Sequence, residues 1–164
     1  MRYELIMWLM ALVKSIPGNT GCVIRNLCLP YKRGVNVKIW NGVQIDSPSK
    51  LFMGNNVSIN RNCILHAGGS IRIGNDVLIG PNVVIYSQNH VFNTPKVLIR
   101  KQGYKLKSVK IGSNVWIAAN SIILPGVEIG SNIVLGANSV VSRSIEKSGV
   151  YAGNPLKFIK PISD

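Results

Sequence analysis

This sequence has few acidic residues: 6 Asp and Glu stand against 19 Lys and Arg, which gives a formal net charge of +13 over 164 residues. Such an excess predicts a partner that carries negative charge, such as a nucleic acid, a membrane surface, an acidic polysaccharide or a phosphate-rich cofactor. Aromatic residues make up only 7%, and the sequence has neither a recognition-helix pattern nor an aromatic stacking motif. We therefore expect no nucleic-acid partner.

Cysteine and histidine are also scarce. The three cysteines, Cys22, Cys28 and Cys63, are an odd number without CxxC spacing. This predicts free thiols in a reducing compartment, and hence a cytoplasmic protein. The sequence contains no G-x-G-x-x-G after a strand, no P-loop and no H-E-x-x-H, so it lacks the common nucleotide and zinc signatures. Its histidines are His66 and His90.

Long apolar runs are absent as well. The stretch from Leu5 to Val13 is too short to span a bilayer, and no small-residue cleavage site follows it, so we predict neither a membrane span nor a signal peptide. Residues 1–18 are predicted to form a helix that ends at Pro17-Gly18. Its apolar face holds Leu5, Leu9, Leu12 and Ile16. We expect it to cap the open end of the fold; the alternative is a helix lying on a membrane.

A six-residue spacing organises the second half of the chain. Aliphatic residues recur at Ile111, Ile117, Ile123, Ile129, Leu135 and Val141, and the residues four positions after each are aliphatic or small. Neither a helix nor a simple strand alternation keeps this period, whereas a parallel β-helix turns a corner every six residues. An ordinary sandwich of short strands has no reason to keep it. We predict an all-β single domain with β-helix coils at 39–90 and 111–146, followed by a C-terminal cap at 147–164.

The repeat is interrupted in three places. It slips by two residues before Met53 and again before Ile73, and we predict a corner with a small bulge at each slip. It then stops over 91–110, an inserted basic loop. The loop carries Lys96, Arg100, Lys101, Lys105, Lys107 and Lys110. A loop of this length without regular structure is usually functional or disordered, and this one begins directly after His90, so we favour function. Residues 19–38 show only strand-like fragments.

Four stretches of the sequence resemble the hexapeptide acyltransferases, most of all the galactoside, maltose and polysaccharide O-acetyltransferases. They are Ile73-Gly-Asn-Asp-Val-Leu-Ile-Gly-Pro-Asn-Val-Val-Ile85 with Asn89-His90 after it, Ile111-Gly-Ser-Asn-Val-Trp-Ile117, Leu124-Pro-Gly-Val-Glu-Ile-Gly130, and Ala152-Gly-Asn-Pro-Leu-Lys157. The resemblance implies a left-handed parallel β-helix with three hexapeptides per coil. It also implies a homotrimer with active sites between subunits, and acetyl-CoA as donor. The γ-class carbonic anhydrases share this helix but use three zinc histidines. This chain has two histidines, so we expect no metal.

Transfer of an acetyl group to a sugar hydroxyl needs a base, and a histidine with a pKa near 6.5 suits that role. The resemblance implies that His90 is this base; otherwise it is a plain loop histidine. His66 occupies an outward repeat position, so we expect a surface or substrate-side residue. For Asn60 the resemblance implies a donor to the acceptor and the tetrahedral intermediate, although its spacing fits a corner residue equally well. Trp116 is predicted to form a wall of the acceptor or pantetheine site, or a trimer contact.

The donor needs backbone groups beside small side chains for its pantetheine arm, and cations for its phosphates. The resemblance places the pantetheine groove along Ala118, Ala119, Ala137, Ser139 and Ser142, and the phosphates near Arg143, Lys157 and Lys160. Lysine stands where relatives carry arginine at the last two positions, which keeps the charge but loses bidentate geometry. A solvated basic tail is the alternative.

The sequence therefore predicts a cytoplasmic, acetyl-CoA-dependent O-acetyltransferase that transfers directly, without an acetyl-enzyme. We expect its acceptor to be a sugar of surface polysaccharide biosynthesis, free, nucleotide-linked or lipid-linked at the inner face of the membrane. One alternative is N-acetylation of an amino sugar, disfavoured because such relatives usually carry an N-terminal α/β domain. The other is a non-catalytic β-helix that serves as a binding or scaffold protein.

Overall fold

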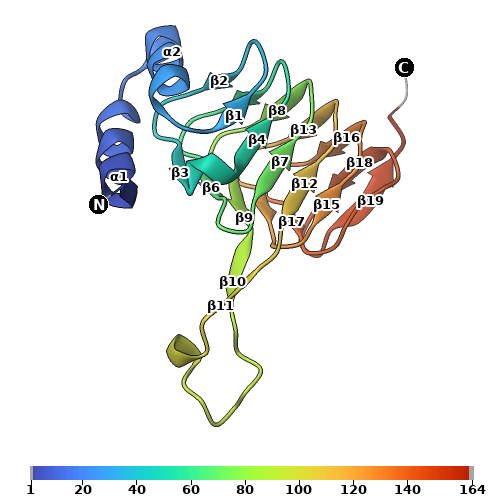
Figure 1. Ribbon diagram of the computed structural model, residues 1–164. Coiled ribbons are helices and arrows are strands. Elements are labelled where there is room, and N and C mark those ends of the chain that lie inside the picture. Colours follow the sequence, from blue (N-terminus) through green and yellow to red (C-terminus); the bar gives the residue numbers. More distant parts are fainter. Residues whose placement is uncertain (1, 163–164) are drawn as a thin grey trace.

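The chain winds into a column of short parallel strands, shown by a computed structural model that describes residues 2–162 (Figure 1). Met1 and the last two residues of the predicted ranges lie outside this part. The coils stack into three sheets, here named A, B and C. Successive coils pair in parallel, as in Lys110 with Glu128 and Trp116 with Val134. The parallel β-helix that the six-residue period predicts is confirmed.

Each sheet takes one strand from each coil, in chain order along the column. Sheet A contains β1 (Lys32–Arg33), β4 (Leu51–Met53), β7 (Ile71–Ile73), β12 (Val109–Ile111) and β15 (Glu128–Ile129). Sheet B contains β2 (Lys38–Ile39), β5 (Ser58–Ile59), β8 (Val77–Ile79), β13 (Val115–Ile117), β16 (Ile133–Leu135), β18 (Gly149–Ala152) and β19 (Lys157–Lys160). Sheet C contains β3 (Gln44–Asp46), β6 (Ile64–His66), β9 (Val84–Tyr86), β14 (Ile122–Ile123) and β17 (Val140–Val141). Strand β19 turns back antiparallel on β18 and ends the column.

The repeating aliphatic positions form the core. From Ile111 to Val141, none of the six residues of the main register is more than 3% exposed. In the second register two serines are also buried, and both hydroxyls are satisfied. Ser121 Oγ donates to the carbonyl of Ala118 at 2.9 Å, and Ser139 Oγ donates to that of Gly136 at 2.6 Å. Because buried polar groups need partners, small hydroxyl side chains fit the inside of a corner where carbonyls are near.

Asparagines stack at the corners. Asn82, Asn114, Asn120 and Asn132 all have φ between 53° and 59°, a left-handed conformation that asparagine tolerates better than other side chains with a Cβ. Their amides form ladders between coils: Asn114 Nδ2 donates to Asn132 Oδ1 at 2.8 Å, and Asn82 Nδ2 to Asn120 Oδ1 at 3.1 Å. The six-residue repeat therefore includes the asparagines of the corners as well as the aliphatic residues of the core.

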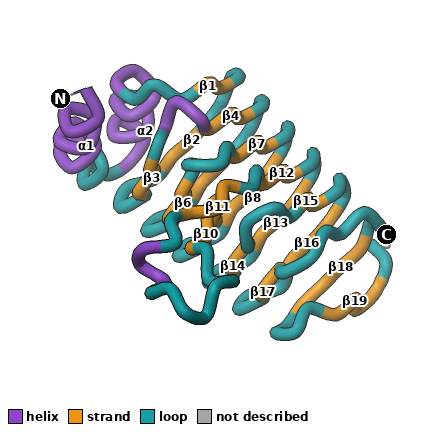
Figure 2. The backbone as a smooth tube through the Cα atoms, turned by 60° about the horizontal axis from the view of Figure 1, so that its bottom comes forward, coloured by secondary structure: helices purple, strands orange, loops and turns teal. Residues whose placement is uncertain are grey.

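All three interruptions of the repeat lie at one corner, between sheet C and sheet A. In the first coils paired residues are 20 apart, as in Lys32 with Phe52, whereas later pairs such as Lys110 and Glu128 are 18 apart. The two extra residues lie after β3, where the short helix η1 (Pro48–Lys50) forms, and after β6. After β9 the insertion leaves the column at the same corner and projects from its side (Figures 1 and 2). The predicted corner bulges are confirmed.

The N-terminal prediction is partly wrong. Helix α1 (Arg2–Val13) ends earlier than expected, and a second helix, α2 (Gly18–Cys28), forms where only strand-like fragments were predicted. With two glycines and a low content of strong helix formers, α2 has little intrinsic helix propensity. It is held by tertiary contacts: Arg25 Nε donates to the carbonyl of Ile39 at 2.8 Å, and Cys22 Sγ to the same oxygen at 3.1 Å. Both helices lie at the start of the column (Figure 1), where α2 packs on strand β2.

Among the helices of the described chain, none combines the length and the apolar content needed to cross a membrane.

Candidate active site

His90 lies at the base of the insertion. It ends strand β10 (Gln88–His90), which pairs antiparallel with β11 (Tyr104–Leu106), so that His90 is opposite Tyr104. The two rings are 4.5 Å apart between centroids and tilted by 42°. The predicted limits of the loop, 91–110, are therefore corrected: His90 belongs to its paired base, and sheet A resumes at Val109. The insertion also contains regular structure, including the short helix η2 (Ile99–Lys101).

The His90 side chain borders two cavities. One, of about 330 Å³, is lined by His66, Tyr86, Gln88 and Tyr104. The other, of about 370 Å³, is lined by Val91, Phe92, Asn93, Lys105, Lys107 and Ser142. The residues Asn89, His90, Leu124 and Pro125 line both cavities. An exposed imidazole therefore lies where two compartments of different character meet, one aromatic and one basic.

His66 shares the aromatic cavity with His90. It projects outward from β6, and its ring stacks on that of Tyr86 in the next coil at 5.7 Å between centroids. Its Nδ1 atom is buried and has no hydrogen-bond partner among the described residues. Two histidines 24 positions apart in the sequence thus line one cavity, because the corner after β6 and the corner after β9 lie on the same edge of the column.

Asn60 and Trp116 lie on other parts of the column than His90. Asn60 follows β5 at the corner between sheets B and C, where its Oδ1 accepts a hydrogen bond from the backbone N–H of Arg61 at 2.8 Å. Trp116 projects from the middle of β13 in sheet B, 51% exposed, between Leu78 and Val134 of the neighbouring coils. Within one chain, neither residue lines the two cavities beside His90.

The predicted donor residues divide into two groups. Ala118, Ala119 and Ala137 follow strands of sheet B, at the same kind of corner as Asn60. Ser142 instead lines the basic cavity beside His90. The next residue, Arg143, lines a depression of about 450 Å³ near the end of the column together with Lys157. Lys160 is exposed on β19 and does not line that depression.

The expectation for Ser139 is wrong. Its side chain is fully buried, and its Oγ donates to the carbonyl of Gly136 and accepts the N–H of Gly153 at 3.1 Å. It occupies the second core register of the repeat, so it cannot face a ligand on the outer surface. The register itself, read from the sequence, places this residue inside.

Two residues of the site were not predicted from the sequence, Tyr86 and Tyr104. Tyr86 occupies the outward position of β9 that is paired with His66 in β6, and the six-residue register could have identified this neighbour. Tyr104 reaches His90 only through the antiparallel register of β10 and β11. That pairing has no signature in the repeat, so the contact could not be found without the structure.

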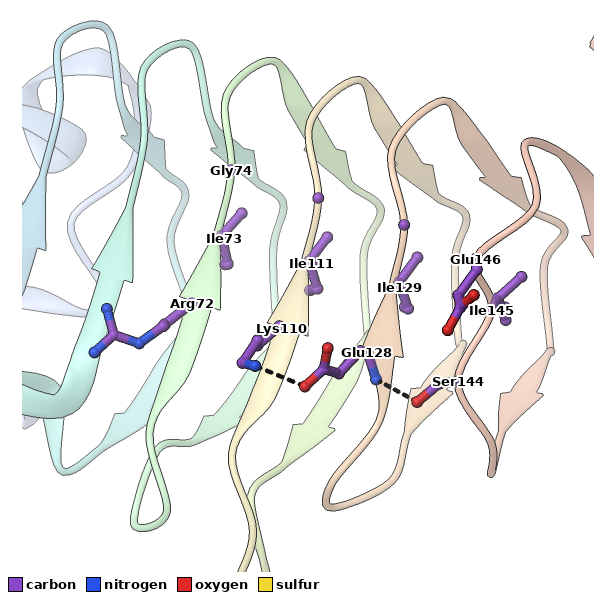
Figure 3. Close-up of a pocket in the computed structure, with 12 residues that line it drawn as sticks. Arg72, Ile73, Gly74, Lys110, Ile111, Glu128, Ile129, Ser144, Ile145 and Glu146 are labelled. Carbon is purple, nitrogen blue, oxygen red and sulfur yellow. Dashed lines mark hydrogen bonds and ion pairs between the residues drawn. The ribbon is translucent and has the colours of Figure 1, made fainter.

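The outer faces of the three sheets differ in chemistry. Sheet A is polar: its outward column is Lys32, Phe52, Arg72, Lys110 and Glu128. A depression of about 600 Å³ on this face contains the exposed ion pair of Lys110 Nζ and Glu128 Oε1, 2.7 Å apart (Figure 3). One outward column of sheet C begins with Gln44 and continues with the aliphatic residues Ile64, Val84, Ile122 and Val140, whereas a second contains Asp46, His66 and Tyr86. The outward column of sheet B begins with Lys38 and Ser58 and continues with Leu78, Trp116, Val134 and Val150.

Within residues 2–162, no three His, Cys, Asp or Glu side chains are grouped so as to hold a metal ion.

Known proteins resemble this chain in sequence. A family model described as bacterial transferase hexapeptide (six repeats) matches residues 108–143. The putative acetyltransferase SAV2555 of Staphylococcus aureus is 38% identical over 130 residues, which are 79% of this chain and 64% of that protein. The chain thus spans less than two thirds of the length of this relative.

Solved structures agree over nearly the whole chain. A maltose O-acetyltransferase from Clostridium difficile has 30% identity and a TM-score of 0.81, over 99% of this chain and 87% of that one. A galactoside acetyltransferase in complex with coenzyme A has 29% identity and a TM-score of 0.86, over 99% and 81%. AntD, an N-acyltransferase from Bacillus cereus with bound dTDP and coenzyme A, has 27% identity and a TM-score of 0.66, over 82% and 86%.

Proposed function

Because this chain belongs to the hexapeptide-repeat acyltransferases, we propose that it transfers the acetyl group of acetyl-CoA to a sugar hydroxyl, with His90 as general base. The observation that carries this proposal is the place of His90 on the shared wall of two cavities. A base that takes a proton from an acceptor and returns it to a leaving group must reach both substrates. An imidazole between two compartments meets this requirement.

The reaction is a direct transfer. The neutral imidazole of His90 takes the hydroxyl proton as the acceptor oxygen attacks the thioester carbonyl. The tetrahedral intermediate carries its negative charge on the former carbonyl oxygen, and it collapses by breaking the carbon–sulfur bond. The leaving thiolate takes the proton from the imidazolium, so that the products are the acetyl ester and coenzyme A. Histidine suits both proton transfers because its pKa lies near neutral pH.

The two cavities differ in the substrate they fit. The cavity lined by Tyr86, Tyr104 and His66 offers aromatic faces and polar edges, which suit a sugar ring with hydroxyl groups. The cavity with Lys105 and Lys107 offers positive charge for the thioester end, where negative charge develops during transfer. From Ser142 the chain continues to Arg143 and Lys157, cations that suit the phosphates of coenzyme A.

The aliphatic outer column of sheet C favours a trimer. In a ring with threefold symmetry, each copy contacts the next through two different edges. If the outer face of sheet C of each copy turned towards the threefold axis, its aliphatic column would be buried there, and the B–C corner of one copy would lie beside the C–A corner of the next. This arrangement would bring Asn60 and Trp116 of one copy towards the edge that carries His90 in the next. Asn60 would then donate to the oxyanion, Trp116 would form a wall of the site, and Ala118, Ala119 and Ala137 would flank the pantetheine arm.

The acceptor that we favour is a sugar of a surface polysaccharide, because a net charge of +13 suits an acceptor bearing a phosphate or carboxylate group. Transfer to an amino sugar is the second candidate, since the likeness to an N-acyltransferase supports it. The two differ in the atom that attacks. A hydroxyl needs a base before it attacks, whereas a neutral amine attacks directly and loses its proton later.

The experiment measures coenzyme A release from acetyl-CoA with the full chain and a panel of galactosides, glucosides, maltosides and amino sugars. We expect turnover with a hydroxyl acceptor, and a fall of roughly 10² to 10⁴ in His90→Ala, while acetyl-CoA binding measured by calorimetry is unchanged. His66→Ala serves as the matched variant, and we expect it to raise KM for the sugar more than it lowers kcat.

Unchanged turnover in His90→Ala would remove the base assignment. Acetylation of amino sugars alone would replace O-transfer by N-transfer. A wild-type protein that binds no acetyl-CoA would favour the non-catalytic scaffold.

A further inference from the structure

The outward side of helix α1 is apolar and uncovered. Leu5, Trp8 and Leu12, spaced three and four residues apart, are 70%, 72% and 71% exposed. The opposite side of the same helix packs on the column through Met10 and Val13, which are buried. A helix that only capped the column would be polar on its outer side. The cap predicted from the sequence accounts for one side of α1 and leaves the other without a function.

Helix α2, which contacts α1, also has exposed apolar side chains, those of Val23 and Leu27. Single exposed aliphatic residues are ordinary, but several large apolar side chains at one end of a molecule mark a surface that binds a partner. Leucines beside a tryptophan are typical of helices that lie in the interface of a membrane.

The charge of this end of the molecule indicates the chemistry of its partner. Glu4 is the one acidic residue among the first forty-five. Exposed cations occur at the same end of the molecule: Lys14 follows α1, and Lys32, Arg33 and Lys38 lie in the first coil, against which α2 packs. An apolar helix side at a cationic end of a molecule fits a bilayer that exposes anionic headgroups, because the apolar side chains enter the interface while the cations attract the headgroups.

We propose that this end of the molecule, through Leu5, Trp8 and Leu12 of α1, binds the surface of an anionic lipid bilayer. A second copy of the chain is the competing occupant. The aliphatic columns of sheets B and C already provide faces for self-association along the column, whereas α1 lies at its end (Figure 1). The insertion with His90 projects from the side of the column (Figures 1 and 2), so docking through the helices would leave that edge open to an acceptor.

The test is co-sedimentation of the full chain with vesicles of phosphatidylcholine, with and without phosphatidylglycerol. We expect binding to the anionic vesicles that weakens as salt is added. The variant Leu5→Gln/Trp8→Gln/Leu12→Gln should lower the partition coefficient at least about tenfold. The matched control is Ile159→Gln, which changes an aliphatic residue of similar exposure, 57%, at the opposite end of the column; it should bind like wild type.

A second measurement does not depend on the triple variant. Lipids brominated on their acyl chains should quench tryptophan fluorescence in the wild type and much less in Trp8→Phe, because the Trp40 indole bonds to Ser58 of the second coil and Trp116 lies farther along the column. Acetyl transfer to a soluble acceptor should be the same in the triple variant and the wild type, which separates this proposal from the proposed function.

Three results would overturn the membrane proposal. The wild type could remain in the supernatant with anionic vesicles, or the triple variant could sediment as well as the wild type. Alternatively, sedimentation velocity without lipid could show an assembly that the triple variant loses and Ile159→Gln keeps, which would assign the surface to a second copy.

Discussion

Replacing Arg25 by methionine is expected to release the two N-terminal helices from the column. The Arg25 side chain is 1% exposed, and it joins three segments of the chain. Its Nε donates to the carbonyl of Ile39 in the first coil, and its Nη1 donates to the carbonyls of Val13 and Ile16 at 2.7 and 2.9 Å. All of these partners are backbone carbonyls, so the guanidinium serves as a hub of donors.

The magnitude follows from the carbonyls that lose a partner. After the substitution the carbonyl of Ile39 would keep the Sγ of Cys22, and that of Val13 would keep the N–H of Ile16 at 3.3 Å, so among the described partners the Ile16 carbonyl is the one left without a donor. That acceptor costs about 1–3 kcal/mol and each of the two other lost hydrogen bonds about 1 kcal/mol, while methionine recovers part of the packing of the arginine stem. The expected net loss is about 3 kcal/mol, which corresponds to a roughly 150-fold larger opening constant for the helices.

The assay is native-state amide hydrogen exchange read by mass spectrometry. Peptides from α1 and α2 should exchange roughly 150-fold faster in Arg25→Met, whereas those of β13 and β16 should be unchanged, because local opening leaves the coils intact. Arg72→Met is the control: Arg72 lies exposed on sheet A, with its guanidinium 4.4 Å from the ring of Phe52, and should leave exchange of both helices unaltered.

Two results would refute this reasoning. Exchange in α1 and α2 within about threefold of wild type would show that these hydrogen bonds do not hold the helices. Equal acceleration in β13 and β16 would show that the column unfolds together with them.

Two further predictions concern the thiols and the shared site. Burial raises the pKa of the Cys63 thiol to about 11, so at pH 8 a thiol reagent should modify exposed Cys28 quickly and Cys63 only after unfolding; a fast reaction of native Cys63 would contradict this. Because the folded pKa is the higher one, this thiol stabilises the fold up to about pH 9, and the contribution is lost as the pH rises towards 11. If His90 and Asn60 meet between subunits, co-expressed His90→Ala and Asn60→Ala chains should regain about a quarter of wild-type activity, since random assembly leaves that share of sites intact; no recovery would place both residues in the site of one chain.

The N-terminal region and the insertion show where sequence reasoning is weakest. Helix α2 forms in a stretch with weak helix propensity because Arg25 and Cys22 bond to a carbonyl of the first coil, and such long-range contacts override local preference. The hairpin of β10 and β11 replaces the unstructured loop that the lack of a repeat indicated. Both differences arise where the six-residue pattern is absent.

The sequence by itself determined the β-helical column, the residues of its core and the edge at which the repeat is interrupted. A residue such as Ile117 or Leu135 faces inward because its place in a six-residue repeat fixes its side of the coil, and Ser139 follows the same rule. The tertiary structure decided which side chains meet at His90. Tyr104 faces it through strand pairing across the insertion, and His66 shares its cavity because stacked coils align one edge. Periodicity is a local property of the chain, whereas register between strands and the stacking of corners arise only when distant segments pack together.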